Sequence, residues 1–450
     1  MKNKWSITAS SVLLIGLLAG CGTSNDSNNA ATASANATAS ANSSSNSASS
    51  APVTLNFMAW GSPDGINQYA ESVFNAFPEL KDKVTINPQI AGKGDTDVAQ
   101  KIRLSLASGE ALPDIVELNR TLLSEFAGAG VLEDLTPVFE PVENNLTDGA
   151  KALVTYDGKY YAFPYEVKSK LWFYRKDLFE QAGIDPTQIT TEDQYLDAAI
   201  KFHQKFPDSY MTNLSNQPPG YWLGMLLSGN GARITDDQGN YVVATDPGIR
   251  KAFESTDRLL KSGAMANIND WTPDWEKGFA DGKIASSLIG NWFKFFLPDY
   301  AKDQDGKWGV TQFPVIADAQ GGSESGGSVY VIPANAPHKA EAIEFLTKAI
   351  LTKEGNLELY KTKLTPVLKD ALEDPAAKEA VPFFGTDLMQ AESKALETLK
   401  VFPFDPSADM EFKILNQYLN KYLMGSASLD DALKQAEADM KTQIGNPLNM

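Results

Sequence analysis

The chain has 450 residues, of which 43% are hydrophobic and 10% aromatic, and its formal net charge is −18. The length predicts two lobes or domains rather than one core, and a lone cysteine, Cys21, excludes a disulfide within the chain. The acidic balance excludes nucleic acid and an anionic membrane surface as partners, because phosphate binding needs clustered lysine and arginine.

The first residues predict export. A basic start precedes a short apolar run at 12–18, and Leu18-Ala19-Gly20-Cys21 follows. This is the layout of a secretory signal peptide, and it is too short to span a bilayer as a mature helix. The four residues that end at Cys21 resemble the lipobox of bacterial lipoproteins, in which the thiol receives diacylglycerol before cleavage. A plain signal peptide with an incidental cysteine is the alternative.

The segment after the cysteine predicts a tether. Residues 1–20 are the expected signal peptide, and residues 21–51 are almost entirely Ser, Ala, Asn, Thr and Gly. Such a composition cannot bury a core and favours disorder. As a flexible coil of about 30 residues it spans roughly 30 Å. The lipobox resemblance implies that Cys21 carries the lipid, and two acyl chains give stable membrane anchoring.

Strands and helices alternate in the next stretch. Alternating or continuous apolar residues predict strands at 53–57, 84–86 and 114–118, and helical spacing predicts helices at 65–77, 98–106 and 122–126. This β-α-β-α-β order implies a parallel sheet. Ligands of such sheets bind beyond the carboxyl ends of the strands. The rule selects Trp60, Gly61, Ser62, Asn119 and Arg120, although Asn119 is equally suited to cap a helix.

A second unit is expected to begin near Tyr165. Its predicted strands are 170–174, 284–289, 308–313 and 328–332, with a small hairpin at 237–240. Its predicted helices are 192–206, 221–227, 249–260, 274–279, 340–350, 410–424 and 429–440. His203 and His338 lie far apart in the sequence, so we expect no histidine-based metal or catalytic site. Residues 303–306 are interpreted as a turn rather than a calcium loop.

Several short motifs follow one another in a familiar order. They are Leu112-Pro113-Asp114, Asp157-Gly158-Lys159-Tyr160, Phe173-Tyr174-Arg175-Lys176-Asp177, Phe279-Ala280-Asp281-Gly282-Lys283, Gly290-Asn291-Trp292 and Gly326-Gly327-Ser328. In this order and spacing, over residues 52–445, the chain resembles the extracellular solute-binding proteins of ABC importers, in the carbohydrate-binding group. Each motif alone is weak evidence for this family, whereas the whole series behind a lipobox is strong evidence.

The resemblance implies an α/β, two-lobed periplasmic-binding-protein-like fold of type II. Each lobe is expected to hold a mostly parallel sheet flanked by helices, with a hinge between the lobes. The first lobe is expected to hold 52–163 plus 309–355, and the second 164–308 plus 356–450. The implied function is that of a lipid-anchored, monomeric binding protein on the outer face of the cell membrane. It captures a carbohydrate, expected to be an oligosaccharide, and delivers it to a permease, with no cofactor and no catalysis.

Two other functions stay open. One is a surface-tethered carbohydrate-active enzyme with an acid/base pair of carboxyl groups in the cleft. The other is a binding protein for a non-sugar solute such as a peptide or a phosphate ester. Incubation with oligosaccharides followed by mass analysis separates binding from catalysis, because a binding protein returns the sugar intact.

Aromatic residues are the first site candidates, because a sugar ring places its apolar face on an aromatic ring. Trp292 follows a predicted strand end, where the resemblance implies a ring that projects into the cleft. Trp60 lies at the end of the first strand. Of Tyr221 and Trp222, one is expected to face the ligand, and helical packing is the alternative for the other. Tyr165, at the expected crossover between lobes, joins this set.

Polar candidates lie nearby. Glu166 and Lys168 share one face of a predicted strand, with Val167 opposite, and Gly327 and Ser328 belong to the last motif. Lys168 stands where maltose-binding members of the family have a carboxylate, so maltose specificity is not carried over. We expect Lys168 to select acidic sugars through a charge-assisted hydrogen bond. Met410 is a second departure, at a position where the family offers an aromatic residue.

Overall fold

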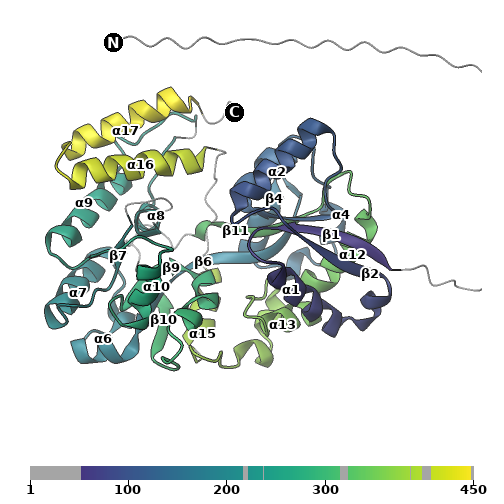
Figure 1. Ribbon diagram of the computed structural model, residues 1–450, viewed down its shortest axis with the longest axis horizontal. Helices are drawn as coiled ribbons and strands as arrows, with labels where there is room; N and C mark the ends of the chain where they lie inside the picture. Colours follow the sequence, from purple (N-terminus) through teal and green to yellow (C-terminus); the bar gives the residue numbers. More distant parts are fainter. Residues whose placement is uncertain are drawn as a thin grey trace, which may run out of the picture. The chain divides into compact units, whose positions relative to one another are not determined.

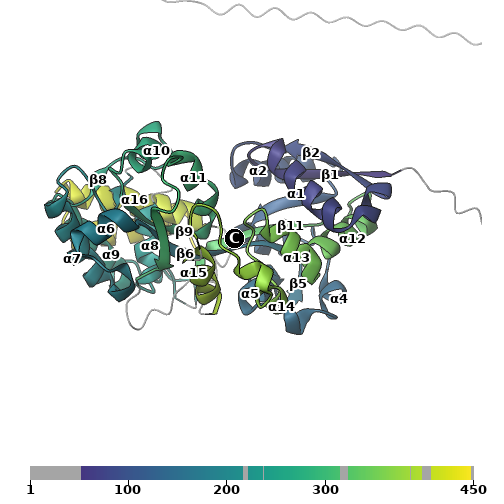
Figure 2. The same cartoon turned by 90° about the horizontal axis from the view of Figure 1, so that it is seen from below.

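The computed structural model describes residues 52–215, 221–236, 238–314, 323–385, 387–397 and 407–446. Cys21 and the expected tether at 21–51 lie outside this range. The described residues belong to one unit of contacts, Ser50–Met450. Figures 1 and 2 show its helices and strands.

A mixed sheet of seven strands is the largest sheet in the described part of the chain, in the order β10-β6-β11-β3-β1-β2, with β9 also paired to β6. Its strands are β1 (Val53–Ala59), β2 (Val84–Ile90), β3 (Ile115–Asn119), β6 (Phe163–Arg175), β9 (Ser286–Gly290), β10 (Trp308–Gln312) and β11 (Ser323–Val331). The pairs β1–β2 and β1–β3 are parallel, whereas every pair made by β6 or β11 is antiparallel. The expectation of mostly parallel sheets therefore holds for the N-terminal strands and is wrong for the others.

The N-terminal strands and helices form the predicted β-α-β-α-β unit, with α1 (Pro63–Ala76), α2 (Asp95–Ser108) and α3 (Leu123–Gly128). Local sequence explains where α1 begins. The Ser62 hydroxyl accepts a hydrogen bond from the backbone nitrogen of Asp64 at 3.1 Å, and Pro63 occupies the first helical position. Both features are preferred at helix N-termini. The end of β1 and the start of α1 are thus joined by a short turn.

Strand β6 passes from one lobe to the other. Its first half pairs with β11, in the register Glu166 to Ser328, and its second half pairs with β9 and β10, in the register Phe173 to Val310. Val167 lies in the first hydrophobic core and Leu171 in the third. The lobes are therefore continuous with each other through one 13-residue strand.

The second half of β6 separates two cores by simple alternation. Leu171 and Phe173 point to one face of the sheet and belong to the third core, whereas Trp172 belongs to the second core on the other face. This is the period of two that a strand imposes. The first core defines the first lobe, and the second and third cores together define the second lobe.

The cores correct the predicted lobe boundaries. The first core includes Leu359, Leu364, Val367, Leu368 and Ala371, although residues 356–450 were expected in the second lobe. The backbone nitrogen of Thr147 donates to the carbonyl of Val367 at 3.0 Å, which ties this stretch to the first lobe. Strand β10, expected in the first lobe, pairs with β6 in the second.

The remaining helices are α4 (Thr136–Phe139), α5 (Asp148–Val154), α6 (Lys176–Ala182), α7 (Glu192–Lys205), α8 (Tyr221–Gly229), α9 (Pro247–Lys261), α10 (Pro273–Ala280), α11 (Leu297–Tyr300), α12 (Lys339–Ile350), α13 (Lys353–Tyr360), α14 (Lys369–Leu372), α15 (Asp387–Glu397), α16 (Ala408–Leu423) and α17 (Leu429–Gln443), together with the 3-10 helix η5 (Asn291–Phe295). Seven of these helices, α7 to α10, α12, α16 and α17, agree closely with the predicted ones, and the others were not predicted. The last two long helices lie side by side (Figure 1).

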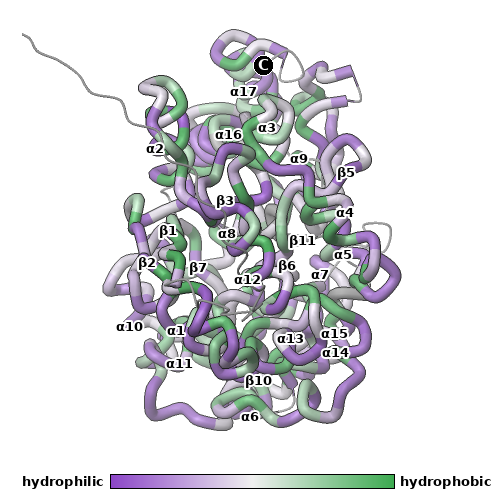
Figure 3. The backbone as a smooth tube through the Cα atoms, turned by 90° about the vertical axis from the view of Figure 1, so that its right-hand side faces the viewer, coloured by the Kyte–Doolittle hydropathy of each residue, from purple (hydrophilic) through white to green (hydrophobic). Residues whose placement is uncertain are grey.

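Hydrophobic and hydrophilic segments alternate along the backbone (Figure 3). None of the helices in the described residues is both long enough and apolar enough to cross a membrane.

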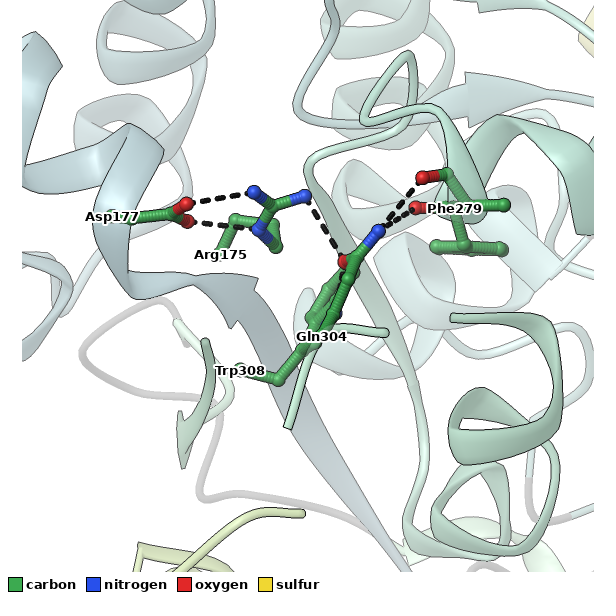
Figure 4. Close-up of polar contacts among 6 residues, drawn as sticks. Arg175, Asp177, Phe279, Gln304 and Trp308 are labelled. Carbon is green, nitrogen blue, oxygen red and sulfur yellow. Dashed lines mark hydrogen bonds and ion pairs between the residues drawn. The ribbon is translucent and has the colours of Figure 1, made fainter. Parts of the chain in front are cut away.

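A buried polar network holds the far end of β6 inside the second lobe (Figure 4). Arg175 donates to both carboxylate oxygens of Asp177 at 2.8 and 2.7 Å, and to Oε1 of Gln304 at 3.0 Å. The Gln304 amide donates to the carbonyl of Phe279 at 3.2 Å, and its Oε1 also accepts from Nε1 of Trp308 at 2.8 Å. The predicted turn at 303–306 therefore supplies a structural glutamine.

Candidate ligand-binding site

Four aromatic side chains gather on the second lobe, and we call them the aromatic platform: Tyr221 at the start of α8, Trp271 before α10, Trp292 in η5 and Phe296 directly after η5. Trp271 and Trp292 stack with ring centroids 5.6 Å apart and an interplanar angle of 18°. Tyr221 and Phe296 lie 5.3 and 5.8 Å from Trp292. Trp271 is 40% exposed and Phe296 37%. The platform therefore presents aromatic surface to solvent, which suits the apolar face of a ring-shaped ligand.

Trp271 adopts an unusual backbone conformation. Its φ of 60° lies in the left-handed region, which bulky residues rarely occupy and which costs about 1–3 kcal/mol. Its indole Nε1 donates to the Tyr221 hydroxyl at 3.0 Å, and its ring packs 5.1 Å from Phe296. Such strain concentrates at functional sites, which marks Trp271 as the principal exposed residue of the platform.

A buried carboxyl group supports the platform from below. Asp270 accepts hydrogen bonds from Nδ2 of Asn213 at 2.7 Å and from the backbone nitrogen of Tyr221 at 3.2 Å. Burial raises the pKa of the Asp270 carboxyl, and the hydrogen bond from Asn213 opposes that shift. Asp270 thereby fixes the first residue of α8, and with it the position of the Tyr221 ring.

Two of the predicted aromatic positions are revised. Trp222 is a core residue: it is 4% exposed, lies in the second core and donates from Nε1 to Oγ1 of Thr256 at 2.9 Å. Its place in the predicted ligand set is wrong, and Tyr221 is the candidate of the pair. Trp292 is 8% exposed and belongs to the third core, because Trp271 stacks over it. Trp292 was predicted to project into the cleft, but in the structure the Trp271 ring covers it.

The end of β1 lies where the strand-end rule places it. Trp60 is half-buried against the first core, and Gly61 and Ser62 are exposed. Gly61 has φ +88° and donates from its backbone nitrogen to the carbonyl of Gly92 at 2.9 Å. This conformation favours glycine. The Ser62 hydroxyl caps helix α1. The groups of this turn that remain for a ligand are therefore the Trp60 ring and the backbone.

The end of β3 holds a helix cap and a partly buried cation. Oδ1 of Asn119 accepts from the backbone nitrogen and the hydroxyl of Thr121, both at 3.1 Å, so the alternative role of a helix cap is the one observed. Arg120 donates from Nη2 to the carbonyl of Thr155 at 3.1 Å, and burial lowers the pKa of its guanidinium. Its buried Nε has no hydrogen-bond partner among the described residues.

Carboxyl groups surround Lys168 on the central sheet. Ser328 of β11 is the register partner of both Asn119 on β3 and Glu166 on β6. Burial raises the pKa of Glu117 to about 8; the Lys168 ammonium opposes this shift and the Glu166 carboxylate adds to it. Burial also raises the pKa of Glu166, again opposed by Lys168. The expectation that Lys168 offers its charge to acidic sugars stays a prediction, because burial favours the neutral form of both neighbouring carboxyl groups.

The Glu166 side chain belongs to this face, and its buried Oε1 has no hydrogen-bond partner in the described part of the chain. Val167 between the two charged residues packs in the first core, as strand alternation predicts. In the residues that the structure describes, His, Cys, Asp and Glu form no group of three or more suited to a metal ion.

Gly327 and Tyr165 have structural partners. A Cβ at Gly327, whose φ is +136°, would lie 2.2 Å from the carbonyl oxygen of Glu166, so only glycine permits this approach of β11 to β6. The Tyr165 ring stacks on Tyr330 with centroids 4.3 Å apart and meets Tyr69 edge-on at 5.7 Å. Both residues shape the sheet face that carries Glu166.

Four residues of the candidate site escaped the sequence reasoning: Trp271, Phe296, Asp270 and Glu117. Trp271 and Phe296 lie outside periodic segments, so pattern analysis passes over them. The sequence did hold one signal for Trp271: it directly precedes Thr272 and Pro273, which cap and begin α10. Glu117 lies inside a strand that otherwise reads as apolar, and a carboxyl group at such a position is itself a functional signal.

The fold matches solved two-lobed solute-binding proteins. The sugar-binding protein MalE of Xanthomonas citri superposes with a TM-score of 0.72 at 20% identity, covering 88% of this chain and 98% of that one. The galacto-N-biose-/lacto-N-biose I-binding protein of Bifidobacterium longum superposes with a TM-score of 0.70 at 22% identity, covering 89% and 98%. The fold and its paired lobes are therefore those of a solute-binding protein.

Residues 72–385 match the family model described as bacterial extracellular solute-binding protein, and the chain belongs to this family. An arabinooligosaccharide-binding protein of Bacillus subtilis is 27% identical over 62% of this chain, and the match spans 64% of that relative's length. The diacetylchitobiose binding protein DasA of Streptomyces coelicolor is 25% identical over 87% of this chain and 89% of its own.

Proposed function

We propose that this protein captures an oligosaccharide between its two lobes and delivers it to the permease of an ABC importer. The exposed aromatic platform carries the proposal, because a stack of indole rings with a solvent-facing edge suits the apolar face of a pyranose or furanose. A ligand shared between the lobes would contact the polar candidates and Trp60 on the first lobe and the aromatic platform on the second.

The polar groups supply the second half of sugar recognition. Sugar hydroxyls need planar or charged hydrogen-bond partners, and Glu166, Lys168 and Arg120 are candidates of that kind. Glu166 Oε1 and Arg120 Nε are buried polar atoms without a hydrogen-bond partner among the described residues. Leaving such groups unpaired costs about 1–3 kcal/mol each, and a bound hydroxyl would recover part of this cost.

Relatives support the choice of ligand class. Their names record arabino-oligosaccharides, lactose and diacetylchitobiose as ligands, and all of these are neutral sugars of two or more units. The proposed location is the outer face of the cell membrane, with Cys21 carrying the lipid and residues 21–51 acting as the tether.

A thermal-shift screen tests the proposal. The panel holds 1,5-arabinotriose, lactose, diacetylchitobiose, maltotriose and β-1,6-galactobiose, with glycerophosphocholine as a non-sugar comparison. A ligand that binds only the folded state at 100 times its Kd stabilises it by about 2.7 kcal/mol, so at least one sugar should raise the Tm by several degrees.

Mass analysis of the same mixtures separates binding from catalysis. The proposal predicts that the sugar which raises the Tm is recovered intact. Cleaved sugar would support the enzyme alternative, and a panel in which only glycerophosphocholine raises the Tm would contradict sugar binding.

A further inference from the structure

A buried ion pair lies where the two lobes meet. Lys294 of η5 donates to Oε1 of Glu392 on α15 at 2.5 Å, and both side chains are 1% exposed. Lys294 also donates to Oγ1 of Thr365 at 2.9 Å, and the Thr365 hydroxyl donates to Oε2 of Glu392 at 2.9 Å. Asn291 adds an amide hydrogen bond to Glu392 at 3.1 Å. We call these four residues the junction network.

The junction network connects parts of both lobes. Glu392 lies on α15, which packs in the third core, whereas Thr365 lies between Leu364 and Val367 of the first core. Asn291 also donates to the carbonyl of Val167 at 3.2 Å, at the point where β6 leaves the first core. Each lobe therefore contributes a partner to the same buried pair.

The 3-10 helix η5 carries both this network and part of the aromatic platform. Asn291 and Lys294, three residues apart, face Glu392, while Trp292 faces Trp271. Phe293 fills the third core, and Phe295 packs against both the first and the third core. Because Trp292 lies between Asn291 and Lys294 on η5, a shift of the η5 backbone moves the Trp292 ring and both hydrogen-bonding residues together.

We propose that Asn291, Lys294, Glu392 and Thr365 are positioning residues that couple the aromatic platform to the junction between the lobes. All four side chains belong to buried residues. They hold η5 at one orientation relative to β6 and to the Thr365 segment, so stacking on the platform and the angle between the lobes change together. The inference rests on the proposed function only for the identity of the ligand.

The buried ion pair of Lys294 and Glu392 is expected to fix the orientation of η5 rather than to add to the stability of the fold. Replacing a buried ion pair by apolar residues of similar volume is often neutral or stabilising, whereas removing one partner is strongly destabilising. A defined orientation of η5, which an apolar pair does not specify, is the property that the two charges add here. Stability and ligand affinity should therefore respond differently to the same substitutions.

The test compares three variants of the full chain with wild type. Thr365→Val is isosteric and removes the hydrogen bonds of Thr365 to Lys294 and Glu392, while the bond from Asn291 to the Val167 carbonyl remains. The double variant Lys294→Met/Glu392→Leu removes the charges and keeps the packing volume. Gln304→Leu is the matched control, because it breaks a buried polar network confined to the second lobe (Figure 4).

Calorimetry with the sugar that gives the largest thermal shift is the main readout. We expect Thr365→Val and the double variant to weaken sugar binding about tenfold or more at a temperature where all proteins are folded. Gln304→Leu should lower the Tm and leave the Kd within about twofold. Unchanged affinity in both junction variants, or an equal loss in the control, would overturn the proposal.

Hydrogen exchange without any sugar is the second readout. The proposal predicts faster exchange of the amides of η5 and of β6 near Val167 in Thr365→Val than in wild type. If no sugar in the panel binds, the proposed function fails, and hydrogen exchange still decides the coupling. Unchanged exchange at both segments would then overturn it.

Discussion

At the scale of single residues, the platform separates an exposed indole from a covered one. Trp271 is exposed and Trp292 is the covered ring behind it. Truncation of a residue at the centre of a binding site typically costs about 2 kcal/mol or more, which is roughly thirtyfold in affinity.

We therefore expect Trp271→Ala to raise the Kd for the sugar about thirtyfold and to leave the Tm almost unchanged, because the Trp271 side chain is 40% exposed and belongs to none of the three cores. Trp292→Ala should weaken binding and also lower the Tm, since it removes a ring from the third core. Calorimetry and thermal melts measure both. Equal losses of Tm in the two variants would show that Trp271 has a structural role like that of Trp292.

Glu117 makes a prediction about pH. Its carboxyl group is protonated in the folded protein up to about pH 8, against an ordinary value of 4.5. The charged groups that face it are Lys168 and Glu166 on β6 and Asp95 on α2. The folded state therefore binds more protons than the unfolded state between about pH 4.5 and pH 8, so this group's contribution to stability falls as pH rises through that window.

Glu117→Gln should remove that contribution. We expect the free energy of unfolding of wild type to fall more steeply between pH 5 and pH 9 than that of the variant, by up to about 1.4 kcal/mol per pH unit. Urea denaturation at pH 5, 7 and 9 gives both slopes. Parallel curves for the two proteins would show that Glu117 ionises normally.

At the scale of elements, helix α8 places neighbouring aromatic residues in different environments. Tyr221 joins the platform and Trp222 fills the second core. Trp222→Ala should cost about 3–5 kcal/mol of stability and leave the affinity of the folded fraction unchanged. Tyr221→Ala should weaken ligand binding and leave the stability almost unchanged, because it removes a partner of Trp271. Denaturant melts and calorimetry on both variants check this, and a Trp222→Ala protein of normal stability would contradict the assignment.

The elements themselves were largely predictable. Helices such as α7 and α9 have clear apolar spacing and good caps at Thr191 and Asp246, so their ends were placed within a few residues. Strand β6 was predicted as two separate pieces, around Glu166 to Lys168 and at 170–174, and not as one continuous strand. Its first half contains a proline and alternates charged residues with apolar ones, so it lacks the continuous apolar run of a buried strand.

At the scale of the whole molecule, the two-lobed fold followed from a series of motifs, whereas the boundary between the lobes did not. Residues 359–371 read as ordinary helix and loop, and only tertiary contacts such as Thr147 to Val367 assign them to the first lobe. The same limit applies to the site. Strand ends could be located from the sequence, but the pairing of Trp271 with Trp292 depends on loops that carry no periodic signal.

The anchor belongs to this scale too. The proposal predicts that Cys21→Ala leaves the body folded and shifts the protein from the membrane to the medium or to an uncleaved precursor. Fractionation of cells and mass analysis of the N-terminus measure this. Normal processing and release of a lipid-free wild-type protein would contradict the lipobox assignment.

The central claim is that a sugar is enclosed between two lobes that move together with the platform. Small-angle X-ray scattering with and without a saturating sugar tests it most directly, because a ligand that binds the closed state better depletes the open one. We predict a smaller radius of gyration with sugar in wild type, and a reduced change in Thr365→Val. A scattering curve that is unchanged by a sugar already shown to bind would contradict the account.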